Sequence, residues 1–179
     1  TTQSVTKLWK PEGNEQILVT ENPHYDGLKH RRSVFFVDQS YFVIVDEAIG
    51  SAKGTVNLNY HLCEGTVNVD GKNNSLTTAY DGPSNMKLQC FAEKKVSMKE
   101  KEGWRSTAYR VRVPRTAVSF DIDKKDPEAI RYITIIYPSK NAASFPVFKA
   151  KFLNKSFDEN GVRIEISVDG KKRQLEYKL

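Results

Sequence analysis

The sequence predicts an all-β protein, and more specifically a two-layer antiparallel β-sandwich. Three observations support this prediction. Short segments rich in Val, Ile, Phe, Tyr and Thr recur along the chain. Asp-Gly, Asn-Gly and similar turn sequences separate many of them. Several segments also alternate apolar and polar residues with a period of two, as expected for sheets with one packed and one solvated face.

About a dozen strands of about five to eight residues are predicted. In chain order they are Ser33–Val37, Tyr41–Val45, Thr55–Leu62, Thr66–Val69, Ser75–Ala79, Met86–Phe91, Thr107–Val113, Ala117–Ile122, Arg131–Tyr137, Val147–Leu153, Val162–Val168 and Arg173–Tyr177. Gln16–Thr20 and Lys124–Ala129 are interpreted as loops or short helical turns. The charged run Lys94–Glu102 is interpreted as the solvated end of a hairpin.

Five joints between these segments have the residues of tight turns. They are Asp38-Gln39-Ser40, Val69-Asp70-Gly71-Lys72, Asp81-Gly82-Pro83, Glu159-Asn160-Gly161 and Asp169-Gly170-Lys171. Because Asn-Gly and Asp-Gly readily adopt the positive φ that two-residue hairpin turns require, we expect the flanking strands to be neighbours in a sheet.

Size and composition indicate one globular unit. The 179 residues fit one domain, residues 1–179, or most of one, with 39% hydrophobic and 28% charged residues. No apolar run is long enough for a membrane span. The net charge of +6 and the pI near 9.2 favour acidic partners, although a merely basic surface is the alternative. Basic residues such as Lys94, Lys95, Lys99, Lys101, Lys171, Lys172 and Arg173 are interleaved with acids rather than with aromatics, so nucleic acid is not an expected partner.

Motifs for metal binding or nucleophilic catalysis are absent from the sequence. His24, His30 and His61 lack zinc-ligand spacing and no CxxC occurs, so no metal site built wholly from this chain is predicted. No Gly-x-Ser-x-Gly or phosphate-binding loop occurs either. Cys63 and Cys90 are expected to be buried free thiols, with a disulfide between neighbouring strands as the alternative.

One segment, residues 24–32, combines two imidazoles, a phenol and three cations just before a hydrophobic strand. Its residues His30, Arg31 and Arg32 are the candidate substrate-binding residues, because guanidinium groups bind sulfate and carboxylate groups. The alternative is that the cations protect a sheet edge and that His30 is a hydrogen-bonded structural residue. Strand alternation places His30 and Arg32 on one face and Arg31 on the other, so the two arginines cannot both face a single ligand.

The runs Leu28–Asp38, Tyr41–Glu47 and Gly54–Leu62 resemble successive strands in heparinase II/III-like polysaccharide lyases, especially those of the heparinase III type. The resemblance covers nearly the whole chain. It implies the C-terminal β-sandwich of an enzyme whose N-terminal α/α toroid packs against it, with heparan sulfate or a related acidic glycosaminoglycan in the cleft between the two. It also implies a periplasmic or secreted location.

Such lyases break hexosamine–uronic acid linkages by β-elimination, which needs a group to stabilise the carboxylate, a base and an acid. The resemblance implies that an Asn, a Tyr and a His upstream of Thr1 supply these roles. No catalytic residue and no cofactor are therefore expected in this chain, although a divalent metal fits the longer enzyme. The alternative is a non-catalytic carbohydrate-binding or interaction sandwich for acidic glycans. A mutarotase-like enzyme is disfavoured because the three histidines are widely separated.

Overall fold

The computed structural model describes residues 3–140 and 144–179, and within these ranges the regular structure consists of β-strands without helices. In chain order the strands are β1 (Val5–Lys10), β2 (Glu15–Tyr25), β3 (Leu28–Val37), β4 (Tyr41–Gly50), β5 (Gly54–His61), β6 (Thr66–Asp70), β7 (Ser75–Ala79), β8 (Asn85–Ala92), β9 (Ser97–Arg105), β10 (Val113–Lys124), β11 (Ile130–Ser139), β12 (Phe148–Phe152), β13 (Gly161–Val168) and β14 (Lys171–Lys178). No helix in the described part of the chain could cross a membrane.

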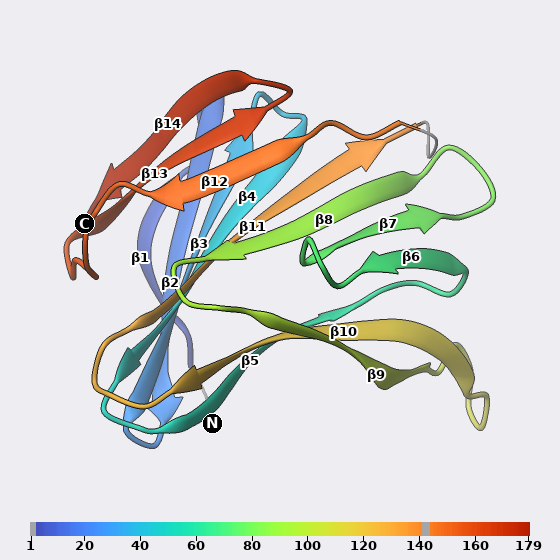
Figure 1. The fold of residues 1–179 in the computed structure, drawn as a ribbon, viewed down its shortest axis with the longest axis horizontal. Coiled ribbons are helices and arrows are strands. Elements are labelled where there is room, and N and C mark those ends of the chain that lie inside the picture. Colours follow the sequence, from blue (N-terminus) through green and yellow to red (C-terminus); the bar gives the residue numbers. More distant parts are fainter. Residues whose placement is uncertain (1–2, 141–143) are drawn as a thin grey trace.

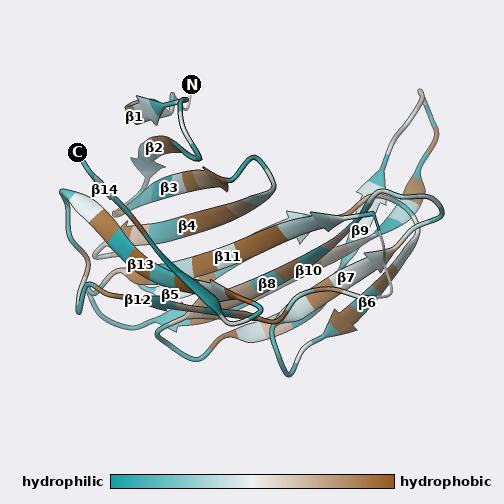
Figure 2. Ribbon diagram, turned by 90° about the horizontal axis from the view of Figure 1, so that it is seen from above, coloured by the Kyte–Doolittle hydropathy of each residue, from teal (hydrophilic) through white to brown (hydrophobic). Residues whose placement is uncertain are grey.

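These strands form three stacked antiparallel sheets, which confirms the predicted antiparallel β-sandwich (Figure 1). The large sheet has eight strands in the order β1-β2-β3-β4-β11-β8-β7-β6. A second sheet has the order β5-β10-β9, and a third has the order β12-β13-β14. Apolar stretches run along β4, β11 and β8 in the middle of the large sheet (Figure 2).

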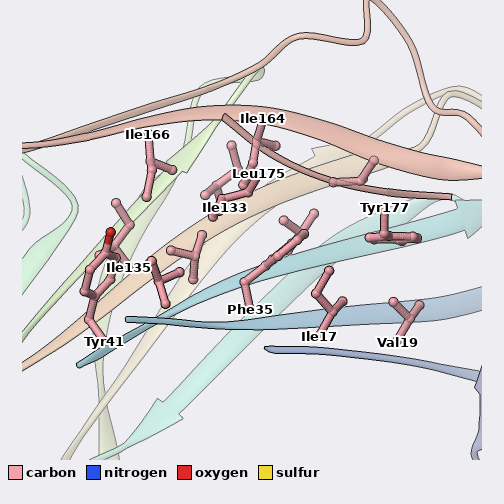
Figure 3. Close-up of a cluster of buried hydrophobic side chains, with 14 of the residues drawn as sticks. Ile17, Val19, Phe35, Tyr41, Ile133, Ile135, Ile164, Ile166, Leu175 and Tyr177 are labelled. Carbon is pink, nitrogen blue, oxygen red and sulfur yellow. The ribbon is translucent and has the colours of Figure 1, made fainter. Parts of the chain in front are cut away.

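The first core lies between the large sheet and the sheet β12-β13-β14. Phe35, Val43 and Ile135 are cross-strand partners in β3, β4 and β11, so their side chains share one face of the large sheet. They are fully buried and pack in one cluster with Ile164 and Ile166 of β13 (Figure 3). The small C-terminal sheet therefore covers this face.

The second core lies on the opposite face of the large sheet. Leu88 of β8 and Tyr132 of β11 occupy the positions that alternate with the first core, and both are buried. They cluster with Leu58 of β5 and Phe120 of β10. The sheet β5-β10-β9 therefore covers the second face, and each small sheet forms its own sandwich with the large one.

All five predicted turns join strands that pair with each other: β3 with β4, β6 with β7, β7 with β8, β12 with β13, and β13 with β14. In the β3–β4 turn, φ is 49° at Asp38 and 50° at Gln39. In the β13–β14 turn, φ is 48° at Asp169 and 81° at Gly170. Two successive positive φ values fit the type I′ turns that match strand twist.

Three predictions about the strands were wrong. Gln16–Thr20 lies within β2, because its backbone pairs with both β1 and β3. Thr107–Val113 is mostly the connection between β9 and β10, despite its β-branched residues. Lys94–Glu102 is largely solvent-exposed, as predicted, but most of it belongs to β9 rather than to a hairpin end, because backbone pairing with β10 does not require apolar side chains on the solvated face. β1 was not predicted from the sequence, because its side chains are mainly exposed and lack an apolar pattern.

The two cysteines are free, and only Cys90 is buried. Burial raises the pKa of the Cys90 thiol to about 12, so this thiol stays protonated and unreactive at neutral pH. Cys63 is exposed, contrary to prediction, because it follows the end of β5 at His61 and no longer faces the core.

Gly50, at the end of β4, allows close approach of the β2–β3 turn. Its φ is +136°, and an added Cβ would lie 2.3 Å from the carbonyl oxygen of Gly27. Gly50→Ala should therefore lower the free energy of unfolding by about 1–3 kcal/mol, measured by urea denaturation. Gly71→Ala is the matched control, because its Cβ would meet no atom within 4 Å and its φ is not left-handed. Equal unfolding midpoints for the two variants would contradict this prediction.

Candidate functional site

The candidate site is a cavity of about 420 Å³ between the large sheet and the edge strand β5. Strands β3 and β4 supply one wall, β5 and the segment before it supply another, and Lys124 at the end of β10 closes one side. The lining residues are Tyr25, Leu28, His30, Arg32, Asp46, Ala48, Ala52, Lys53, Gly54, Thr55, Val56, Asn57, Leu58, Asn59, Lys124 and Tyr132.

A hydrogen-bonded cluster of His30, Arg32 and Asp46 occupies the β3–β4 wall. Arg32 and Asp46 are cross-strand partners, and the guanidinium donates to both carboxylate oxygens, with Nε 2.7 Å from Oδ1 and Nη2 3.2 Å from Oδ2. His30, two residues before Arg32 on the same face, has its Nε2 2.7 Å from Asp46 Oδ1. Asp46 therefore fixes the orientation of both the His30 imidazole and the Arg32 guanidinium in the cavity wall.

In this cluster the carboxylate is buried, whereas the imidazole and the guanidinium are partly exposed to the cavity. The Asp46 side chain is only 4% exposed, whereas those of His30 and Arg32 are 33% and 38% exposed. Burial alone would lower the pKa of Arg32, but the hydrogen bonds and charge of Asp46 outweigh it and raise that pKa. Arg32 therefore stays cationic.

Some nitrogen atoms of this cluster remain available to a ligand. Within the described residues, Arg32 Nη1 and His30 Nδ1 have no hydrogen-bond partner from the protein. With Nε2 donating to Asp46, His30 Nδ1 accepts a hydrogen bond when the ring is neutral and donates one when it is protonated. The pair can thus orient an anionic group or exchange a proton with a bound molecule.

The β5 wall presents the apolar side chains of Val56 and Leu58 toward the large sheet, whereas Asn57 and Asn59 lie on the alternate face of the strand and bind within their own sheet. Asn57 donates to Asp121 at 2.7 Å, and Asn59 accepts from Lys101 at 3.3 Å. Lys53 adds an exposed cation at the rim. An exposed ammonium and a guanidinium beside an apolar floor suit a polar ring that carries sulfate or carboxylate groups.

Lys124 lines the cavity but is committed to the protein. Its side chain is buried, and Nζ donates to the carbonyl oxygens of Asp126 at 2.6 Å and Glu128 at 2.7 Å. It therefore holds the connection to β11 in place. The connection, residues 125–129, is a loop, in agreement with one of the two interpretations of that segment.

Arg31 lies on the other face of β3, as strand alternation predicts. It is 1% exposed, and its Nε and Nη2 each lie 2.7 Å from Glu21 Oε1. Its Nη1 donates to the carbonyl oxygen of Asp158 at 3.3 Å, and its guanidinium lies 5.2 Å from the centre of the Phe157 ring. Because protein encloses Arg31, the hypothesis of a ligand-binding role is kept for His30 and Arg32 only.

The alternative role for these cations, protection of a sheet edge, was wrong. β3 pairs with β2 on one side and with β4 on the other, so it is an inner strand of the large sheet. The structural interpretation of His30 as a hydrogen-bonded residue is confirmed by its contact with Asp46.

A second charged feature, missed by the sequence analysis, crosses the face that carries Arg31. Cross-strand pairing aligns Glu21, Arg31, Glu47 and Arg131 in β2, β3, β4 and β11. Arg131 then binds Glu93 through Nε at 2.8 Å and Nη2 at 2.6 Å. Acidic and basic residues thus alternate along the row across the sheet.

The β12–β13 connection covers this row. Arg131 donates to the carbonyl oxygens of Ser156 at 3.0 Å and Asn154 at 3.1 Å, while Arg31 binds that of Asp158. These contacts make the row a structural anchor for the connection. Its charges, unlike those of the cavity, are directed into the protein.

Within the described residues, no group of three or more His, Cys, Asp or Glu side chains could hold a metal ion. His30 and Asp46 are the two potential ligand residues that come together in the cavity. His24 and His61 do not line it.

Comparisons with known proteins give consistent results. The profile of the family described as "Heparinase II/III-like, C-terminal" matches residues 2–151. The chain is 56% identical to the heparin-sulfate lyase of Bacteroides stercoris over 178 residues, covering 99% of this chain and 27% of that protein. It is 38% identical to that of Bacteroides thetaiotaomicron, covering 96% of this chain and 25% of that protein.

Solved structures give the same result. A heparinase III structure has 58% identity and a TM-score of 0.97, covering all of this chain and 28% of its own. The heparan sulfate lyase of Pedobacter heparinus has 27% identity and a TM-score of 0.89, covering 99% of this chain and 28% of its own. The chain thus spans about a quarter of the length of the relatives that it matches.

Proposed function

This chain belongs to the heparinase II/III-like C-terminal family, and from that premise we propose that it is the C-terminal β-domain of a heparan-sulfate lyase. The longer enzyme would cleave hexosamine–uronic acid linkages by β-elimination. This domain would form one wall of the substrate cleft, and an N-terminal toroid would form the other. The catalytic Asn, Tyr and His would lie outside this chain.

The observation that carries the proposal is the cavity with its cluster of His30, Arg32 and Asp46. A heparan-sulfate chain bears sulfate and carboxylate groups, which a guanidinium with one free amino group can bind. Asp46 holds Arg32 and His30 in place before the ligand arrives, which lowers the entropic cost of binding. His30 and Arg32 are the proposed substrate-binding residues.

A periplasmic or secreted location also belongs to this proposal, because extracellular glycosaminoglycan is the proposed substrate. The basic net charge of +6 supports attraction of such a polyanion. A divalent metal in the longer enzyme also fits this proposal, with its ligands supplied by the rest of that enzyme.

The proposal predicts that binding and chemistry can be separated. The 179-residue chain alone should be retained weakly on immobilised heparin and released by added salt, because screening weakens the attraction between exposed charges. It should form no unsaturated uronate, measured by ultraviolet absorbance on heparan sulfate. Turnover by this chain alone would contradict the assignment of catalysis to the rest of the enzyme.

In the longer enzyme, His30→Ala and Arg32→Ala should each lower kcat/KM by about tenfold or more, since each removes a hydrogen bond to a charged group. The matched control is Arg163→Ala, which removes a guanidinium exposed on β13 and paired with exposed Glu176. Melting temperatures identify any loss caused by unfolding. Unchanged kcat/KM in both cavity variants would exclude the cavity from substrate binding. No lyase activity in the unmodified longer protein would favour a non-catalytic glycan-binding sandwich.

A further inference from the structure

The turn end of the β9–β10 hairpin, which comprises the end of β9, the connection and the start of β10, is rich in arginine and aromatic residues. From Trp104 to Arg115 the chain contains four arginines, two large aromatic residues and no carboxylate. The net charge of the whole chain is only +6, so this short segment contributes much of the excess. It lies at the free end of the β9–β10 hairpin (Figure 1).

The aromatic residues of this segment are exposed rather than part of a core. Tyr109 is 88% exposed and Trp104 is 39% exposed. Each has an arginine over its ring: Arg112 Cζ lies 3.8 Å from the centre of the Trp104 ring, and Arg110 Cζ lies 5.3 Å from that of Tyr109. Ring faces and guanidinium groups are therefore presented together at the surface.

The positive charge here is only partly compensated. Arg112 lies 3.6 Å from Glu102, and Arg105 lies 3.5 Å from Glu64, but all four side chains are well exposed, and such pairs contribute little. Arg110 and Arg115 have no carboxylate partner within the described residues. By contrast, buried Arg131 has a bidentate carboxylate partner in Glu93.

The hairpin end and the cavity lie at opposite ends of β10. The hairpin adjoins Val113, where β10 begins, whereas the cavity reaches Lys124, where it ends. The 12 residues of β10 span on the order of 35 Å at about 3.3 Å per residue. A ligand that contacts both places must be an extended polymer.

We propose that the hairpin end, residues 104–115, is a second binding site for a sulfated polysaccharide, separate from the cavity. The guanidinium groups bind sulfate or carboxylate groups, and the exposed rings pack against the apolar faces of sugar rings. This inference rests on the proposed function for the identity of the polymer. It adds a contact that favours long chains over short oligosaccharides.

The test compares two double variants of the 179-residue chain that lose the same charge. Arg110→Ala with Arg112→Ala removes two guanidinium groups from the hairpin end, and Lys171→Ala with Lys172→Ala removes two exposed ammonium groups from the start of β14. Binding to long heparan sulfate and to a short oligosaccharide is measured by calorimetry at several salt concentrations. Melting temperatures confirm that each variant folds.

The arginine variant should lose about tenfold in affinity for the long chain, whereas its affinity for the oligosaccharide should change less than twofold. The lysine variant should stay within about twofold of the unmodified chain for both ligands. Trp104→Ala with Tyr109→Ala should also weaken long-chain binding without changing its salt dependence, because no charge is removed. Equal losses in the arginine and lysine variants would overturn the proposal, since net charge alone would then explain binding.

Two further results would overturn the assignment to a polysaccharide. One is tighter hairpin-dependent binding of a single-stranded polynucleotide than of heparan sulfate. The other is a lower melting temperature for the arginine variant in the longer enzyme but not in this chain, which would make the hairpin an interdomain contact. A different outcome separates this site from the lyase function. If the longer protein has no lyase activity but its arginine variant still loses long-chain binding, the hairpin site is supported and the lyase function is contradicted.

Discussion

Arg31→Ala is expected to lower the free energy of unfolding by about 3–5 kcal/mol, the usual cost of removing one partner from a buried ion pair. Arg31 is 1% exposed and pairs with Glu21 through two nitrogen atoms at 2.7 Å. Its loss leaves the buried carboxylate of Glu21 with Lys29, 3.4 Å away, as its remaining cation, and leaves the fully buried Glu47 with Arg131 as its neighbouring cation. It also removes a contact with the carbonyl oxygen of Asp158. Urea denaturation at neutral pH measures the change.

Arg163→Ala is the matched control for this prediction. Arg163 pairs with Glu176 at 3.0 Å, but the two side chains are 55% and 61% exposed, so the loss should stay below about 1 kcal/mol. A similar small change for Arg31→Ala would show that the buried row is not a structural anchor. Reduced substrate binding with unchanged stability would instead restore Arg31 as a candidate ligand-binding residue.

Much of the fold could be predicted because turns and alternation are local signals. The Asp38–Ser40 turn indicates that Val37 and Tyr41 are neighbours, as the structure confirms. By contrast, β2 was missed because its polar residues weaken the alternation, and its strand character depends on pairing with β1 and β3. Backbone pairing between distant segments is not encoded in the composition of one short window.

The candidate site could be predicted only in part, for the same reason. Alternation correctly separated Arg31 from His30 and Arg32. The β3–β4 turn also fixes the register that places Arg32 opposite Asp46, so this partner was within reach of sequence reasoning. The second wall and the buried row were not, because they require β5 in another sheet and the pairing of β4 with β11, far apart along the chain.

Glu47 differs from the other members of the buried row because it has no hydrogen-bond partner. It is 0% exposed, and neither carboxylate oxygen has a partner within the described residues. Burial raises the pKa of Glu47 to about 7, even though the charges of Arg31 and Arg131 act to lower it. Those arginines already hydrogen-bond to Glu21 and Glu93.

The free energy of unfolding is therefore expected to fall as the pH rises, and Glu47→Gln should abolish the part of this fall that comes from Glu47. The unfolded carboxyl has a pKa of 4.5 and the folded one about 7, so between these values the folded state holds more protons and stability falls as pH rises. The cost of ionising Glu47 approaches about 3 kcal/mol above pH 7, by the free energy of a pKa difference of this size. Glutamine keeps the shape without that cost.

Urea denaturation at intervals between pH 5 and pH 8 tests this expectation. The variant should match the unmodified chain near pH 5 and be more stable at pH 8, with the gap opening between those values. Glu176→Gln is the control, because Glu176 is 61% exposed and should produce no such gap. A Glu47→Gln variant that is less stable at pH 8 would mean that Glu47 is ionised there and is needed to balance Arg31 and Arg131.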